Sequence, residues 1–216
     1  MKTSFRTNII LALLITPLFV ACEGGIFNSD DDKNTAAKVD TVKNLPSDPP
    51  LSIGPMGPVG TGKYTLYNFE TKSIVANTDS ATNKWDIGFR ATSIIFNSGV
   101  SGPGSVSGQL VQGIFDELKL APESGYRQDA AGNPVISNVS GQGWYTYTGP
   151  MGNPVNVILP TPGRILVLRT NKGNYVKMEI LSYYRDNPPV NTLTQMSPSR
   201  YITFRFAHQG NGGRSF

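Results

Sequence analysis

Cysteine and histidine are almost absent from this chain. One cysteine, Cys22, and one histidine, His208, occur in its 216 residues. A single cysteine excludes an internal disulfide framework and a zinc site built from several thiolates. A single histidine near the end of the chain gives a Ser-His-Asp triad little support. No pair of carboxylates stands in a recognisable catalytic context, and no glycine-rich segment ends in Gly-Lys-Ser/Thr. We therefore expect a protein that is not an enzyme.

Long hydrophobic runs are absent as well, except for residues 8–20. This run follows two basic residues, Lys2 and Arg6. Its length fits the apolar region of a secretory signal better than a membrane span. We therefore predict a signal peptide over residues 1–21.

The position of the cysteine indicates the signal of a lipoprotein. Residues 19–22, Phe-Val-Ala-Cys, resemble a bacterial lipobox, in which the cysteine is acylated and becomes the new N-terminus. Leucine is more usual than phenylalanine at the first position of that motif. Several acyl chains anchor firmly, since each buried CH₂ contributes about 0.8 kcal/mol. We expect lipidation of Cys22; the alternative is a plain secretory signal with an incidental cysteine.

A strong excess of one charge is also missing. The chain has 19 basic and 15 acidic residues, and two of the basic ones lie in the predicted signal. The mature chain therefore keeps 17 basic residues against 15 acidic ones, a net charge of +2. This balance does not indicate a dedicated surface for nucleic acid or anionic lipid, and we expect no nucleic-acid partner.

Glycine and proline, by contrast, are plentiful, at 23 and 16 residues. Strand-forming residues recur in short runs separated by turns, and long helical periodicity is scarce. This pattern predicts an all-β domain with short helical turns, in which a turn at residues 171–174 closes a β-hairpin. The predicted strand runs are residues 64–69, 73–76, 84–90, 92–96, 144–148, 164–170, 175–185 and 201–206.

Composition also predicts the limits of this domain. Residues 22–62 are polar and rich in proline, so they are expected to form a flexible, disordered tether. The single β-rich domain is predicted over residues 63–208, with a glycine-rich loop at residues 97–108. Residues 209–216 are expected to be a frayed tail.

Several motifs, taken in chain order, resemble the HmuY family over nearly the whole predicted domain. The resemblance implies a β-rich fold like that of lipid-anchored or secreted proteins of Bacteroidota. Characterised members of that family bind haem and pass it to an outer-membrane uptake receptor. The motifs are Trp85-Asp86, residues 94–97, residues 99–104, residues 122–126, Gly143-Trp144, residues 164–170, residues 183–186 and residues 202–206.

This resemblance implies a lipid-anchored, haemophore-like carrier that serves iron acquisition, with haem b as its carried ligand. It also implies a TonB-dependent receptor as partner and an outer-membrane location, facing either the cell surface or the periplasm. Function follows sites rather than folds, so one alternative stays open. In that alternative the chain is a non-haem surface lipoprotein, a module that interacts with a protein, a glycan or another ligand.

The ligand loops of the family contain few donors in this chain. Family members with a known site hold the iron between two histidines or two methionines. The loop of the first ligand corresponds to residues 127–142, which contain no His, Met, Cys or Tyr. The second ligand follows the tryptophan strand, where Met151 is the candidate for the haem iron, since a thioether is a known axial donor. The alternative is a loop thioether packed on an aromatic ring. His208 lies outside both ligand loops.

An aromatic strand precedes the candidate ligand. Strand alternation places Tyr145 and Tyr147 on one face and Trp144 on the other. We name these three residues, together with Met151, as the haem-binding candidates. Met56 repeats the Gly-Pro-Met-Gly context of Met151 and is a further thioether to consider.

Overall fold

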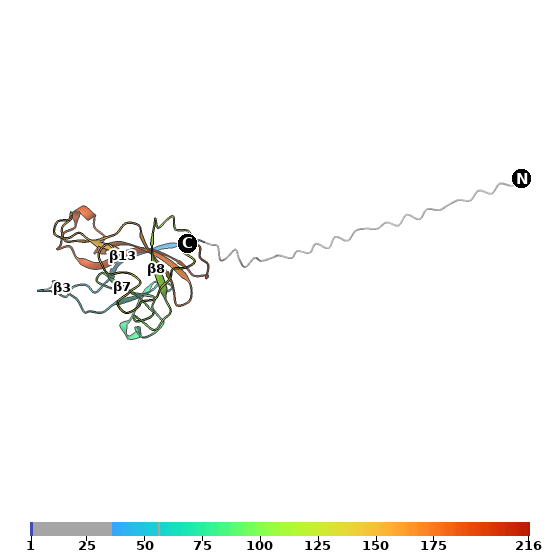
Figure 1. Ribbon diagram of the computed structural model, residues 1–216, viewed down its shortest axis with the longest axis horizontal. Helices are drawn as coiled ribbons and strands as arrows, with labels where there is room; N and C mark the ends of the chain where they lie inside the picture. Colours follow the sequence, from blue (N-terminus) through green and yellow to red (C-terminus); the bar gives the residue numbers. More distant parts are fainter. Residues whose placement is uncertain (2–35, 56) are drawn as a thin grey trace.

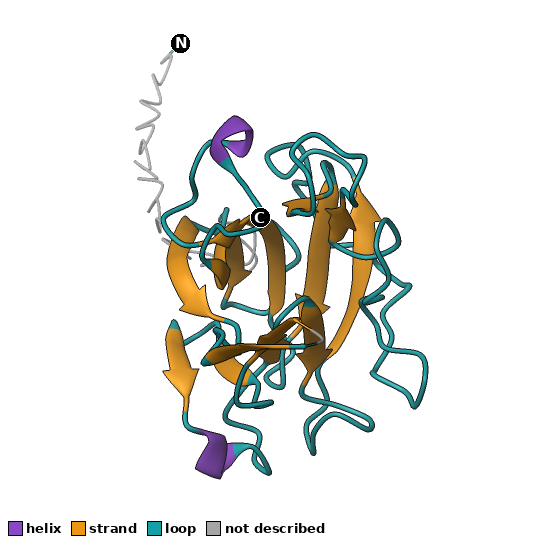
Figure 2. Cartoon of the chain, turned by 90° about the vertical axis from the view of Figure 1, so that its left-hand side faces the viewer, coloured by secondary structure: helices purple, strands orange, loops and turns teal. Residues whose placement is uncertain are grey.

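The computed structural model describes residues 1, 36–55 and 57–216. The predicted signal peptide, Cys22 and Met56 lie outside the described residues. Antiparallel strands account for the architecture, which confirms the predicted all-β class (Figure 1). The helices of the described part are two short 3₁₀ turns at the periphery, η2 (Asn77–Asp79) and η3 (Val190–Thr192), neither of which could cross a membrane (Figure 2).

Two larger sheets and two short hairpins make up the domain. The five-stranded sheet has the order β1 (Val39–Pro46), β13 (Ser199–Gln209), β12 (Tyr175–Tyr184), β11 (Arg164–Arg169) and β8 (Ser107–Gln112). The four-stranded sheet has the order β5 (Ser73–Val75), β4 (Thr65–Asn68), β6 (Ile87–Arg90) and β7 (Ser93–Phe96). The two hairpins are β2 (Ser52–Gly54) with β3 (Gly57–Val59), and β9 (Tyr145–Tyr147) with β10 (Ile158–Pro160).

The main core lies between the two larger sheets. Phe204 of β13 meets Tyr67 of β4 edge-on, with ring centroids 5.6 Å apart, and stacks on Phe89 of β6 at 5.7 Å. All three rings are buried, and such aromatic pairs add to the free energy gained from burial alone. Ile87 and Phe89 of β6 both belong to this core, whereas Trp85 is buried outside the cluster that contains them.

Each predicted strand run contains a strand, and β11 with β12 forms the predicted hairpin. The prediction missed β1, β2, β3, β8 and β10. Strand β8 begins inside the segment predicted as a glycine-rich loop, which therefore ends before Ser107. Short edge strands carry too few side chains to show a period of two, so the sequence pattern does not identify them.

The predicted tether is wrong over residues 39–46. These residues form β1, which pairs antiparallel with β13 from Val39 opposite Ala207 to Pro46 opposite Tyr201. Leu45 is buried in the main core, and Val42 packs against it. The strand was missed because a bulge between Val42 and Leu45 breaks the alternation, which leaves the apolar residues three apart.

The predicted frayed tail is also wrong. The last residue, Phe216, is buried, and its backbone N–H donates to the carbonyl oxygen of Lys119 at 2.8 Å. It belongs to a second apolar cluster on the outer face of the five-stranded sheet, where the tail covers side chains of β11. This cluster consists of Phe115, Ala121, Ile165, Val167, Ala207 and Phe216.

A lysine is buried in this second cluster. Lys177 is only 4% exposed, and its Nζ donates to the carbonyl oxygens of Phe115 at 2.8 Å and Leu118 at 2.9 Å. The same nitrogen lies 4.5 Å from the centre of the Phe115 ring. No ion pair among the described residues includes this lysine, and burial lowers its pKa. Carbonyl dipoles and an aromatic face therefore stabilise the charge.

The lowered pKa predicts how stability depends on pH. In the folded protein the pKa of Lys177 lies below 10.5, the ordinary lysine value that applies in the unfolded chain. The folded protein therefore loses this proton at a lower pH than the unfolded chain does. Buried charge thus costs stability at neutral pH, and this cost disappears as pH rises through the folded-state pKa. Compared with Lys177→Met, the wild type should gain free energy of unfolding as pH rises from neutral toward 10.5. Urea unfolding at several pH values measures this difference; a difference that stays constant with pH would contradict the assignment.

Candidate functional site

Two of the candidate haem-binding residues belong to the core. Trp144 is 2% exposed; its Nε1–H donates to the carbonyl oxygen of Thr92 at 2.8 Å, and its ring lies 6.1 Å from that of Tyr183. Tyr145 is 7% exposed, with its hydroxyl donating to the carbonyl oxygen of Asn138 at 2.6 Å. Both rings are therefore covered by protein in this structure.

Close packing of the backbone explains why a glycine precedes the tryptophan in the Gly143-Trp144 motif. A Cβ on Gly143 would lie 1.9 Å from the carbonyl oxygen of Ser137, so only glycine lets the two backbone segments approach this closely. The close approach brings residues 137–142 over the aromatic strand. Tyr145 is buried for this reason, although β9 is only three residues long.

The other two candidates lie at the surface of the β9–β10 hairpin. Tyr147 is 45% exposed, and its hydroxyl donates to Asn156 Oδ1 at 2.8 Å. Met151 is 95% exposed in the connecting loop, so its thioether contacts little of the protein. This exposure argues against the alternative in which Met151 packs on an aromatic ring. The hairpin thus presents a phenol and a thioether to solvent.

A groove of about 420 Å³ lies beside this loop. Pro154 and Val155 of the loop line one side, and Leu193 lies among the residues that line the other. Asn156 Nδ2 donates to Gln195 Oε1 at 3.1 Å, which joins the two segments. The groove therefore lies beside the loop that carries Met151, and three of its seven lining residues, Pro154, Val155 and Leu193, are apolar.

Met196 is a functional candidate that the sequence reasoning passed over. Its side chain is 81% exposed and lines an adjoining groove, of about 270 Å³, which shares Gln195 with the groove beside the Met151 loop. In the sequence it stands in a short connection before Pro198, where no pattern distinguishes it. Only the folded chain brings its segment against the loop of Met151.

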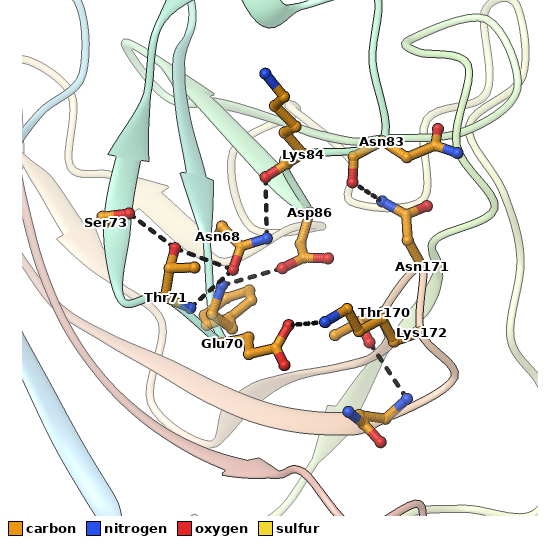
Figure 3. Close-up of polar contacts among 12 residues, drawn as sticks. Asn68, Glu70, Thr71, Ser73, Asn83, Lys84, Asp86, Thr170, Asn171 and Lys172 are labelled. Carbon is orange, nitrogen blue, oxygen red and sulfur yellow. Dashed lines mark hydrogen bonds and ion pairs between the residues drawn. The ribbon is translucent and has the colours of Figure 1, made fainter.

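His208 lies in a different place, in a polar corner between the β11–β12 turn and the four-stranded sheet (Figure 3 shows this corner). Glu70 and Lys172 form an ion pair there at 2.7 Å, and Asn171 Nδ2 donates to the carbonyl oxygen of Asn83 at 3.2 Å. Burial lowers the pKa of His208, and its Nε2 has no hydrogen-bond partner among the described residues. His208 does not line the groove beside Met151.

A cluster of protein ligands for a metal ion is not present either. No group of three or more His, Cys, Asp or Glu side chains in the described part of the chain could hold one.

The described residues thus form an all-β domain whose short strands are joined by surface loops. Residues 61–205, well over half of the chain, match the family model described as HmuY protein, and the chain belongs to the HmuY family. The resemblance read from the sequence is thereby confirmed. Comparison with curated proteins finds no match.

Comparison with solved structures finds chains that are similar over most of their length. The apo HmuY analog TFO of Tannerella forsythia is 14% identical, with a TM-score of 0.48, and the match covers 80% of this chain and 95% of that one. Apo PinO from Porphyromonas gingivitis is 13% identical, with a TM-score of 0.46 and coverage of 81% and 97%. The family assignment itself rests on the sequence match.

Proposed function

We propose that the protein is a lipid-anchored haem-binding carrier of the bacterial envelope, which holds its ligand stoichiometrically and does no chemistry on it. The observation that carries this proposal is membership of the HmuY family over residues 61–205. The acylated Cys22 would hold the domain at the outer membrane, facing the surface or the periplasm, and a TonB-dependent receptor would accept the haem. Mass spectrometry of Cys22 tests the anchor, and an unmodified thiol would reject it.

The proposed haem site is the groove beside the β9–β10 loop. Met151 supplies a free thioether to the iron, and Tyr147 supplies an exposed ring next to it. Pro154, Val155 and Leu193 offer apolar surface to a porphyrin face. Met196 is the proposed second thioether; it lines the adjoining groove, which shares Gln195 with this one. Soft sulfur ligands favour the softer ferrous ion, so this site should bind reduced haem more tightly than oxidised haem.

Absorbance titration of the mature chain with hemin, with and without dithionite, tests this site. We expect a Soret shift that saturates at one haem per chain and a lower Kd in the reduced state. Met151→Ala should raise the Kd for reduced haem about tenfold or more, equivalent to at least about 1.4 kcal/mol. Met196→Ala should act in the same direction.

Ile114→Ala provides the matched control, because this side chain is exposed but does not line the groove. Its Kd should equal that of the wild type. No Soret shift in either redox state would reject haem carriage. A normal shift in the Met151→Ala variant would reject the ligand assignment while leaving haem binding in place.

A second candidate function is a non-haem interaction module, and the β2–β3 hairpin favours it. Leu51, Ile53 and Val59 are exposed at 76%, 74% and 50%, and strand β3 lies at the opposite end of the domain from the C-terminus (Figure 1). Exposed apolar side chains gathered on one element mark interaction surfaces. A colourless protein that co-purifies with an outer-membrane receptor would favour this function over haem carriage.

A further inference from the structure

A second and larger groove, of about 690 Å³, lies on the edge of the five-stranded sheet. Its walls come from β8, from the first residue of β11 and from the loop over residues 125–142. It shares no lining residue with the groove beside Met151. No His, Met, Cys or Tyr lines it, so it offers no axial donor to a haem iron. The haem proposal therefore leaves this groove without a role.

The groove is cationic. Arg127 and Arg164 line it, and no aspartate or glutamate does. No ion pair among the described residues includes either arginine. The nearby carboxylate of Asp129 is buried and accepts the backbone N–H groups of Phe96 and Val135, both at 2.8 Å. Neither positive charge is therefore neutralised by the protein.

Both guanidinium groups keep hydrogen-bonding capacity. Arg127 donates to neutral oxygens only, with the shortest contact, 3.0 Å, to the carbonyl oxygen of Val135. Arg164 makes one long contact, 3.4 Å, to the carbonyl oxygen of Gly141. Its Nε is buried and has no partner among the described residues. A ligand in the groove would therefore have to use the terminal nitrogens of the two guanidinium groups, because the buried Nε is out of its reach.

The remaining lining residues narrow the class of ligand. A guanidinium offers five N–H donors in a planar fork that matches a carboxylate. Amide side chains add donors and acceptors suited to hydroxyl and acetamido groups. Only small apolar patches interrupt this polar surface, so a hydrophilic guest fits better than a lipid or a porphyrin. The amide-bearing residues are Gln109, Asn133, Asn138 and Gln142.

From this arrangement we propose that the groove between β8, β11 and residues 125–142 binds an acidic sugar, whose carboxylate pairs with Arg164 and Arg127 and whose hydroxyl groups meet the amide side chains. The site is independent of the haem proposal, and each can fail without the other. No covalent step is involved.

Isothermal titration calorimetry with N-acetylneuraminate, D-glucuronate, D-glucose and inorganic phosphate tests the proposal on the mature chain. An acidic sugar should bind with one site per chain, whereas glucose should not. Arg164→Gln and Arg127→Gln should each weaken that binding about tenfold or more, since each removes a charge-assisted pair. Raising NaCl from about 0.05 M to about 0.5 M should weaken it further. Arg90→Gln, which changes an arginine outside the groove, should leave it unchanged.

Backbone amide shifts in a ¹H–¹⁵N spectrum give a readout that needs no variant. N-acetylneuraminate or glucuronate should shift signals from residues 132–142 and leave those of the β9–β10 loop in place. Failure of both acidic sugars to bind, or shifts located elsewhere, would overturn the proposal. Phosphate binding as tight as that of the sugars would also overturn the proposal, because the site would then recognise negative charge without selecting a sugar. Hemin titration of the same samples reports separately on the carrier function.

Discussion

Replacing Asp129 by alanine should lower the free energy of unfolding by about 2–5 kcal/mol, because it leaves two buried N–H donors without acceptors. The carboxylate is 3% exposed and accepts from Phe96 at the end of β7 and from Val135 in the groove loop. The Asp129 carboxylate therefore links the four-stranded sheet to the loop over residues 125–142, which lines the groove of Arg127 and Arg164. Chemical denaturation followed by tryptophan fluorescence measures the loss.

Two variants separate this role from a general effect of lost charge. Asp129→Asn keeps one side-chain oxygen as an acceptor, so its loss should be smaller than that of Asp129→Ala. Asp116→Ala removes an exposed carboxylate that pairs with Arg205, and should cost at most about 1 kcal/mol. If Asp129→Ala were as stable as Asp116→Ala, the carboxylate would not be the link between sheet and loop.

The central strands could be predicted because their side chains alternate on buried faces. In β13, Ile202, Phe204 and Phe206 point into the core at a period of two. The β11–β12 hairpin adds a glycine turn at Gly173, whose φ of +82° favours that residue. Pattern and turn chemistry agree in these segments, and the strand positions, the hairpin and the family resemblance could be predicted from them.

The site could be predicted only in part, since surface exposure does not follow from alternation in a three-residue strand. Strand alternation places Tyr145 and Tyr147 on the same face. Tyr145 is nevertheless covered by residues 137–142, whereas Tyr147 is exposed to solvent. The position of Met196 near the Met151 loop depends on contacts between segments that are distant in the sequence. The presence of Arg127 and Arg164 in one groove depends on such contacts as well. No local pattern encodes such contacts, and a single sequence does not show them.

Removal of residues 36–46 should cost more than any single substitution considered above, about 5 kcal/mol or more, when burial of Leu45 and the lost ladder hydrogen bonds are combined. These residues supply β1, the edge partner of β13. Asp40 also pairs with Lys72 at 2.7 Å, which links β1 to the turn after β4. Since domains of this kind are stable by only about 5–15 kcal/mol, a chain that starts at residue 47 should be largely unfolded or prone to aggregate.

A chain that starts at residue 36 is the matched control, because it keeps β1 and lacks only the segment before it. Its melting temperature should equal that of the mature, unlipidated chain, and light scattering should show a monodisperse sample. Aggregation of the shorter chain is expected because loss of β1 exposes the N–H and C=O groups of β13 along a new sheet edge. Equal melting temperatures for chains starting at 36 and 47 would mean that residues 36–46 act as a tether after all. In that event, the segment between Cys22 and the folded domain would be 11 residues longer (residues 36–46) than β1 pairing allows.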